Sequence, residues 1–188
     1  MVTQNTRDKI IDTVIRLYSQ YSYEEISTNQ IIEEIGISKG TLYWHFKTKE
    51  DMFDAAFDRC YKKTLEYTRM NADDSAPVID CLKLYLKNLT ILNKADPYCM
   101  QILTKHIPVV AKQEHPFPYG EFREDLMKYA RKGLRNKEII DLPENFIVHT
   151  IFLVTSGFIH YLNMHPQCYE NEALIHKMID SLLKSMQP

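Results

Sequence analysis

The segment from Ile35 to Glu50 decides how the chain is understood, and its sequence is IGISKGTLYWHFKTKE. Gly36 interrupts an apolar helical pattern and supplies a tight turn. Ser38 is suited to cap a new helix over residues 39–46, because its hydroxyl can accept a backbone N–H of the first turn. Upstream, residues 27–30 (STNQ) form a capping box that predicts the start of another short helix. Two short helices joined by a glycine-containing turn are typical of a helix-turn-helix.

The charge of this segment differs from that of the whole chain. The 188 residues carry 23 lysines and arginines and 25 acidic residues, and the net charge of -2 is a mild argument against nucleic acid. Between Glu34 and Glu50, however, there is no acidic residue, whereas Lys39, His45, Lys47 and Lys49 are all present. The segment therefore predicts a local basic surface of the kind that binds DNA phosphates.

The other residue types of the segment also suit a DNA surface. Thr41 and Tyr43 offer hydroxyl groups, and Gly40 lets the backbone approach a phosphate closely. Trp44, the single tryptophan, stands where so short a helix is expected to face outward. Lys49 belongs to the first turn of a fourth helix, whose free N–H groups favour an anion. Since the second helix of a helix-turn-helix lies in the major groove, these side chains are predicted to contact DNA.

Residues 35–50 resemble the recognition segment of the tetracycline-repressor (TetR) family, and residues 6–57 fit that family's DNA-binding head throughout. Leu42 and Phe46 match core positions of that family's DNA-binding head. Two departures stand out: Ser22 replaces a usual glycine, and Ile32 and Ile35 replace common alanines, which requires adjusted helix packing. The resemblance implies eight positions that face DNA: Thr28, Lys39, Gly40, Thr41, Tyr43, Trp44, His45 and Lys49.

An all-α fold is predicted for the whole chain. Only five glycines are present, too few for many tight hairpins. Apolar periodicity and capping residues predict about nine helices: one ending near residue 21, then 27–35, 39–46, one from 49, 78–93, one from 97, 119–137, 144–162 and 170–186. We expect a three-helix DNA-binding head over residues 1–50, which the fourth helix links to a body over residues 51–188. The resemblance implies that this body binds a ligand and dimerises.

The body is rich in aromatic residues and methionines, most of which are expected to form its core. The resemblance implies that some of them line a ligand cavity between helices. An apolar and aromatic lining predicts a largely hydrophobic, small-molecule effector. The residues predicted to bind it are Phe57, Tyr61, Tyr85, Met100, Phe122 and Phe152.

Two apolar segments near the C-terminus predict a homodimer. Residues 146–162 are apolar nearly all round, and residues 174–182 carry an apolar stripe. The resemblance implies that the two helices pair with their symmetry mates in a four-helix interface. We expect no membrane span, because the segment 146–162 is short and contains His149, Ser156 and His160, and we expect a cytoplasmic protein.

Catalytic and metal-binding patterns are not found in the sequence, and we expect neither an enzyme nor a cofactor. There is no G-x-S-x-G, no glycine-rich phosphate loop and no H-E-x-x-H. The four cysteines have no C-x-x-C spacing, so reduced thiols are expected.

The function that the sequence predicts is transcriptional repression. The homodimer is expected to bind double-stranded DNA at an inverted-repeat operator and to release it when a small molecule occupies the body. The alternative is a structural or interaction protein that uses the same head on chromosomal DNA and binds a protein partner with its body. A cavity in the body favours the first function, and a filled core with an exposed patch favours the second.

Overall fold

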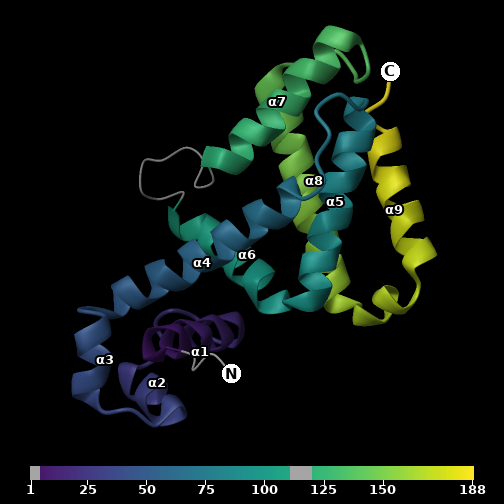
Figure 1. Ribbon diagram of the computed structural model, residues 1–188. Coiled ribbons are helices and arrows are strands. Elements are labelled where there is room, and N and C mark those ends of the chain that lie inside the picture. The colour runs from purple at the N-terminus through teal and green to yellow at the C-terminus, as the bar shows by residue number, and fades with distance from the viewer. Residues whose placement is uncertain (1–4, 111–119) are drawn as a thin grey trace. The chain divides into compact units, whose positions relative to one another are not determined.

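The computed structural model describes residues 5–110 and 120–188, with the side chains of 104–110 left aside. Within these ranges the chain forms nine α-helices and one 3-10 helix and has no strand, which confirms the predicted all-α fold (Figure 1). The helix start predicted at residue 119 lies outside the described residues. The elements are α1 Thr6–Gln20, α2 Thr28–Ile35, α3 Lys39–His45, α4 Lys49–Arg69, α5 Val78–Ala95, α6 Pro97–Val110, α7 Gly120–Asn136, α8 Glu144–Met164, η1 Pro166–Glu170 and α9 Glu172–Lys184.

Side-chain caps begin the short N-terminal helices where the sequence predicts them. The Ser27 side chain accepts the Gln30 N–H at 3.1 Å, and Ser38 Oγ accepts the Thr41 N–H at 3.0 Å. Gly36 ends α2 with a φ of 72°, in the left-handed region that glycine adopts without strain. Local interactions therefore fix the start of both helices and the turn between them.

Contacts divide the chain into two compact units. The first comprises the described part of residues 1–63 together with 98–106, and the second comprises 64–97 with the described part of 107–188. The division falls inside α4, so one continuous helix belongs to both units. The domain boundary predicted at residue 50 lies at the start of this helix and stays a prediction.

The first unit is built on α1, α2 and α3, which pack in sequence order. Salt bridges add to this packing on the surface: Arg16 of α1 pairs with Glu34 of α2, and Arg59 of α4 pairs with Asp8 and Asp12 of α1. The buried apolar side chains of this part include Ile10, Ile11, Val14, Leu17, Ile26, Ile31, Leu42, Phe46, Met52 and Phe53.

In the second unit α5 packs against α7, α8 and α9, and α7 also packs against α8 (Figure 1). The buried apolar residues recur at helical spacing on α5, at positions 78, 82, 85, 86, 89 and 92. Such spacing gives one broad apolar face, which explains why this helix can pack against several other helices. The Arg69 side chain at the end of α4 reaches α7, where its Nε lies 2.7 Å from Asp125 Oδ2 and its Nη1 lies 3.0 Å from Glu121 Oε2.

The helix α8 is longer than the apolar segment predicted from the sequence. Its 21 residues would be long and apolar enough to cross a membrane, a property that it shares with many core helices of soluble proteins. One face is buried, and the helix packs against α5 and α7. The opposite face exposes several large apolar side chains, namely Phe146, Leu153, Tyr161 and Met164.

The start of the last helix differs from the prediction. The sequence predicts α9 from residue 170, but Pro166–Glu170 form a separate 3-10 helix. Asn171 then caps α9, because its side chain accepts the Leu174 N–H at 3.0 Å. The cap sets the first helical residue at Glu172.

Candidate nucleic-acid interface

The short helix α3 has two faces of opposite character. Leu42 is fully buried, and Phe46, which caps the C-terminal end, is 4% exposed. On the other side Trp44 is 81% exposed and Tyr43 is 40% exposed, as the sequence predicts. Because two neighbouring aromatic side chains are exposed together on one short helix, this face is a candidate binding surface.

The residues around the two aromatic rings complete a surface suited to DNA. Lys39 is exposed, and its Nζ lies 6.0 Å from the centre of the Tyr43 ring. Gly40 is exposed as well, and a Cβ at this position would have only Ser38 Oγ as a neighbour, at 3.7 Å. The backbone of the first turn is therefore open to the close approach of a phosphate.

The three remaining candidates in α2 and α3 are only partly exposed. Thr28 is the first residue of α2. The hydroxyl groups of Thr41 and Ser38 lie 2.8 Å apart and form a hydrogen bond, so Thr41 is already partnered. The His45 ring meets the Trp44 ring edge-on, with 4.6 Å between ring centres. Together with the exposed side chains, these residues place seven of the eight predicted positions on two successive helices.

Lys49, the eighth position, is in a different environment. Its Nζ donates a hydrogen bond to the backbone carbonyl of Tyr23 and lies 4.1 Å from the centre of the Tyr23 ring. Desolvation by burial lowers the pKa of Lys49, and the nearby Glu24 carboxylate partly opposes this shift. The sequence predicts a free phosphate ligand here and gives no sign of the contact with Tyr23, which joins residues far apart in the chain.

The comparisons with known proteins bear on this region first. Residues 10–56 match the family model described as bacterial regulatory proteins, tetR family. These residues form a DNA-binding head of the tetR type. Its helix-turn-helix is the family's, and the resemblance noted in residues 35–50 is confirmed.

Two curated relatives extend the likeness beyond the head. AcrR of Shigella flexneri, a helix-turn-helix transcriptional regulator, is 28% identical over 104 residues, which cover 53% of this chain and 48% of AcrR. IcaR of Staphylococcus epidermidis, a negative transcriptional regulator of a biofilm operon, is 30% identical over 69 residues, 37% of each chain. The matches thus span about half or less of these relatives. Both are regulators, in agreement with the prediction that the chain is not an enzyme.

A solved structure matches nearly the whole chain. The transcriptional regulator FadR of Bacillus subtilis, in complex with stearoyl-CoA, has a TM-score of 0.73 over 95% of this chain and 98% of its own. At 18% identity this likeness shows a common fold. The part of the chain beyond the head therefore has the same all-α fold as this solved structure.

The departures from the tetR-family pattern cause no strain. Ser22 does not adopt a positive φ, and its N–H donates to Glu25 Oε2 at 2.8 Å, so a glycine is not required there. Ile31 is the buried residue of α2, whereas Ile32 and Ile35 are partly exposed. The side chains of Ile32 and Ile35 are larger than alanine, and the additional atoms lie at the edge of the core of the head.

The residues predicted to bind a ligand belong to both units. In the second unit Tyr85 and Phe122 are buried on α5 and α7, and Phe152 is partly buried on α8. These three helices pack together, and burial raises the pKa of Tyr85, which keeps its hydroxyl neutral. In the first unit Met100 is buried on α6, while Phe57 and Tyr61 of α4 stack with ring centres 6.1 Å apart.

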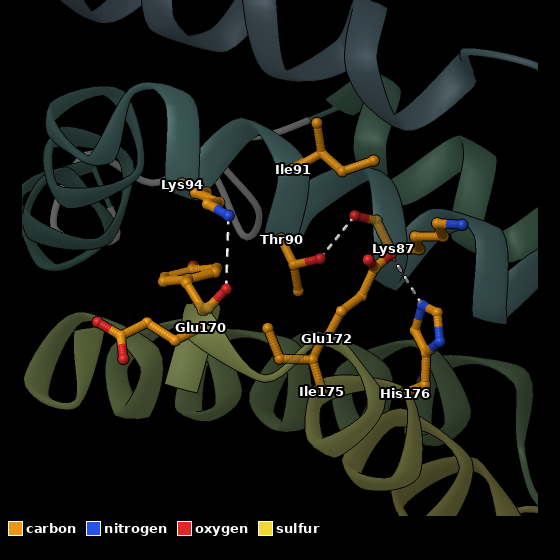
Figure 2. A pocket seen from close by; sticks show the side chains of 9 residues that line it. Lys87, Thr90, Ile91, Lys94, Glu170, Glu172, Ile175 and His176 are labelled. Atoms are coloured by element: carbon orange, nitrogen blue, oxygen red, sulfur yellow. Dashed lines mark hydrogen bonds and ion pairs between the residues drawn. The ribbon is translucent and has the colours of Figure 1, made fainter. Parts of the chain in front are cut away.

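A surface groove between α5 and the η1–α9 segment was not predicted (Figure 2). It has a volume of about 290 Å³, and none of the six predicted ligand residues lines it. Lys87 and Lys94 come from α5, whereas Glu172 and His176 come from α9. In an adjoining hollow Lys83 Nζ lies 2.8 Å from Asp180 Oδ1. Because both signs of charge are present, the groove does not form a basic surface for nucleic acid.

Proposed function

We propose that this protein is a sequence-specific DNA-binding transcriptional repressor that acts as a homodimer and is released by a small, mostly hydrophobic molecule. The observation that carries the proposal is the exposed face of α3, where Lys39, Tyr43 and Trp44 stand opposite the buried Leu42. IcaR, which is 30% identical to this chain over 69 residues, is a negative regulator, which supports repression. Because its target is chromosomal DNA, the protein is expected to work in the cytoplasm.

The mechanism of repression follows from occupancy. A helix-turn-helix places its second helix in the major groove, and one head reads only a few base pairs. Two heads related by a two-fold axis read an inverted repeat, which gives the specificity that one head lacks. A protein bound at a promoter in this way excludes polymerase.

Selection from a random duplex library tests the DNA-binding part of the proposal. We expect the recovered sequences to contain an inverted repeat whose half-site centres lie roughly 34 Å apart, one turn of DNA. Footprinting then shows whether both half-sites are protected. The triple variant Lys39→Ala, Tyr43→Ala, Trp44→Ala should recover no common sequence. A single asymmetric half-site, or equal recovery by wild type and variant, contradicts the proposal.

The proposed effector site is supported by the aromatic residues of the body. Tyr85, Phe122 and Phe152 come from three helices of one unit that pack together, and burial of apolar surface is what such a lining offers a ligand. FadR holds stearoyl-CoA within the same fold, so an acyl chain is a reasonable member of a test panel.

A route from effector to DNA is proposed through α4. This helix begins beside the recognition helix and ends at Arg69, which pairs with Glu121 and Asp125 of α7. A ligand that displaces α7 changes the position of Arg69 and, with it, the end of a rigid helix. The effector only has to favour the displaced state to weaken DNA binding.

Calorimetry with and without the selected DNA tests this coupling. We expect an effector from a panel of apolar compounds, stearoyl-CoA among them, to bind at least about 5-fold more weakly to the DNA complex. By thermodynamic reciprocity it must weaken DNA binding by the same factor. Arg69→Ala should retain effector affinity and reduce the coupling. Equal affinities mean that a compound is no effector, and failure of the whole panel favours the alternative, a protein partner for the body.

A further inference from the structure

The ammonium group of Lys49 lies in a cradle made by two aromatic rings and one carbonyl. Its Nζ donates to the Tyr23 carbonyl oxygen and lies 4.1 Å from the Tyr23 ring centre and 5.6 Å from the Phe53 ring centre. Both ring distances are within the range of cation–π attraction. The contact ties the segment between α1 and α2 to the first turn of α4.

The rings of the cradle are themselves held in place. Tyr23 meets Phe53 edge-on, with ring centres 4.7 Å apart and an interplanar angle of 75°. Phe53, which is buried, meets Tyr18 of α1 in the same way at 4.9 Å and 72°. Burial raises the pKa of Tyr23, and the acidic groups Glu50, Asp54 and Glu24 raise it further. The ring therefore stays neutral and presents an electron-rich face to the lysine.

The cradle leaves part of the ammonium group available. Lys49 is only partly buried, and an ammonium has three N–H donors, of which the Tyr23 carbonyl takes one. A side chain already fixed at the start of α4 loses less rotamer freedom when it binds than a free lysine does. The Asp51 N–H of that turn already donates to Thr48 Oγ1 at 3.0 Å, so the Lys49 ammonium is the group that the turn offers to an anion.

We propose that Tyr23 is a positioning residue for DNA binding, which holds the Lys49 ammonium at the first turn of α4 with its remaining donors directed to a DNA phosphate. The inference rests on the proposed function, and it assigns a role to a residue outside the recognition helix. Tyr23 acts through Lys49 and makes no contact of its own with a base.

A double-mutant cycle over a salt series tests the inference on the selected inverted repeat. Lys49→Ala should lower affinity and reduce the salt slope by about one phosphate per head. Tyr23→Leu should lower affinity by roughly 3- to 10-fold with an unchanged slope, because the charge remains but the ring face is lost. Tyr23→Phe keeps the ring and should behave as wild type. In the Lys49→Ala background Tyr23→Leu should have no further effect.

A readout without DNA keeps the test independent of the proposed function. The Lys49 ε-methylene protons should show a ring-current shift in wild type and Tyr23→Phe, and the shift should become clearly smaller in Tyr23→Leu, where only the Phe53 ring remains nearby. Should Tyr23→Leu lose helix content, Tyr23→Met replaces it, because methionine fills the space without a ring. The inference is wrong if Tyr23→Leu binds DNA more tightly than wild type does. It is also wrong if the losses of affinity in the cycle are additive, or if Tyr23→Phe binds DNA more weakly than wild type. Failure of wild type to bind DNA overturns the proposed function, while the NMR shift still reports the cradle.

Discussion

Replacing Tyr43 with alanine is expected to lower affinity for the selected DNA by on the order of 10- to 100-fold and to leave folding stability nearly unchanged. The side chain is 40% exposed and shares a face of α3 with Lys39 and Trp44, so little packing is lost with it. In a dimer each substitution acts on two heads, which enlarges the effect on the whole complex. Fluorescence anisotropy at fixed salt measures affinity, and thermal unfolding followed by circular dichroism measures stability.

The preceding residue, Leu42, is a matched control. Leu42 is fully buried, and Leu42→Ala should destabilise the head by about 2–5 kcal/mol through lost burial and the cavity that remains. Tyr43→Ala should therefore lower the affinity for DNA without lowering the melting temperature, whereas Leu42→Ala should lower the melting temperature. If Tyr43→Ala lowers the melting temperature as Leu42→Ala does and keeps its affinity, Tyr43 is a core residue and the DNA face of α3 is misassigned.

The parts of the fold that could be predicted from the sequence are those governed by local interactions. The caps at Ser27 and Ser38 and the positive φ at Gly36 involve residues within one turn of each other, so residue type and spacing are sufficient to place them. The outward position of Trp44 follows in the same way, because Leu42 and Phe46 occupy the inner face of so short a helix. Seven of the eight candidate DNA contacts were also predicted from residue type and local charge, whereas Thr28 came with the family resemblance alone.

Contacts between distant residues could not be predicted. The Tyr23–Lys49 cradle requires knowing how the α1–α2 connection returns to α4, and neither residue type nor spacing contains that information. The groove between α5 and α9 depends in the same way on pairing of helices far apart in the chain, including the Lys83–Asp180 salt bridge. The late start of α9, by contrast, has a local cause that the sequence prediction missed, because Asn171 is the cap and the residues before it form a 3-10 helix.

The largest effect is expected from Leu153→Glu, which should convert the protein to a monomer. Leu153 is 70% exposed in the middle of an apolar face of α8 that also includes Phe146, Tyr161 and Met164. An apolar face that gathers several exposed large side chains is typical of an interaction surface, and it fits the proposed pairing of α8 with its symmetry mate. A buried glutamate opposite its own copy would be unpaired and repelled by a like charge. Sedimentation velocity measures the change of mass.

Loss of the dimer should lower the affinity for DNA by a mechanism that the point variants of α3 do not share, because it separates the two heads. In a dimer the second head binds at a high effective concentration, so separating the heads should lower operator affinity by on the order of 10²- to 10⁴-fold. Ile91→Glu is the matched control, because Ile91 is an exposed apolar residue of α5 and the groove that it lines includes no residue of α8. It should remain dimeric and bind DNA as wild type does. Helix content must be preserved in both variants, since a monomer that has unfolded says nothing about the interface. A dimer that persists in Leu153→Glu, or one that dissociates in Ile91→Glu, moves the interface away from the exposed face of α8.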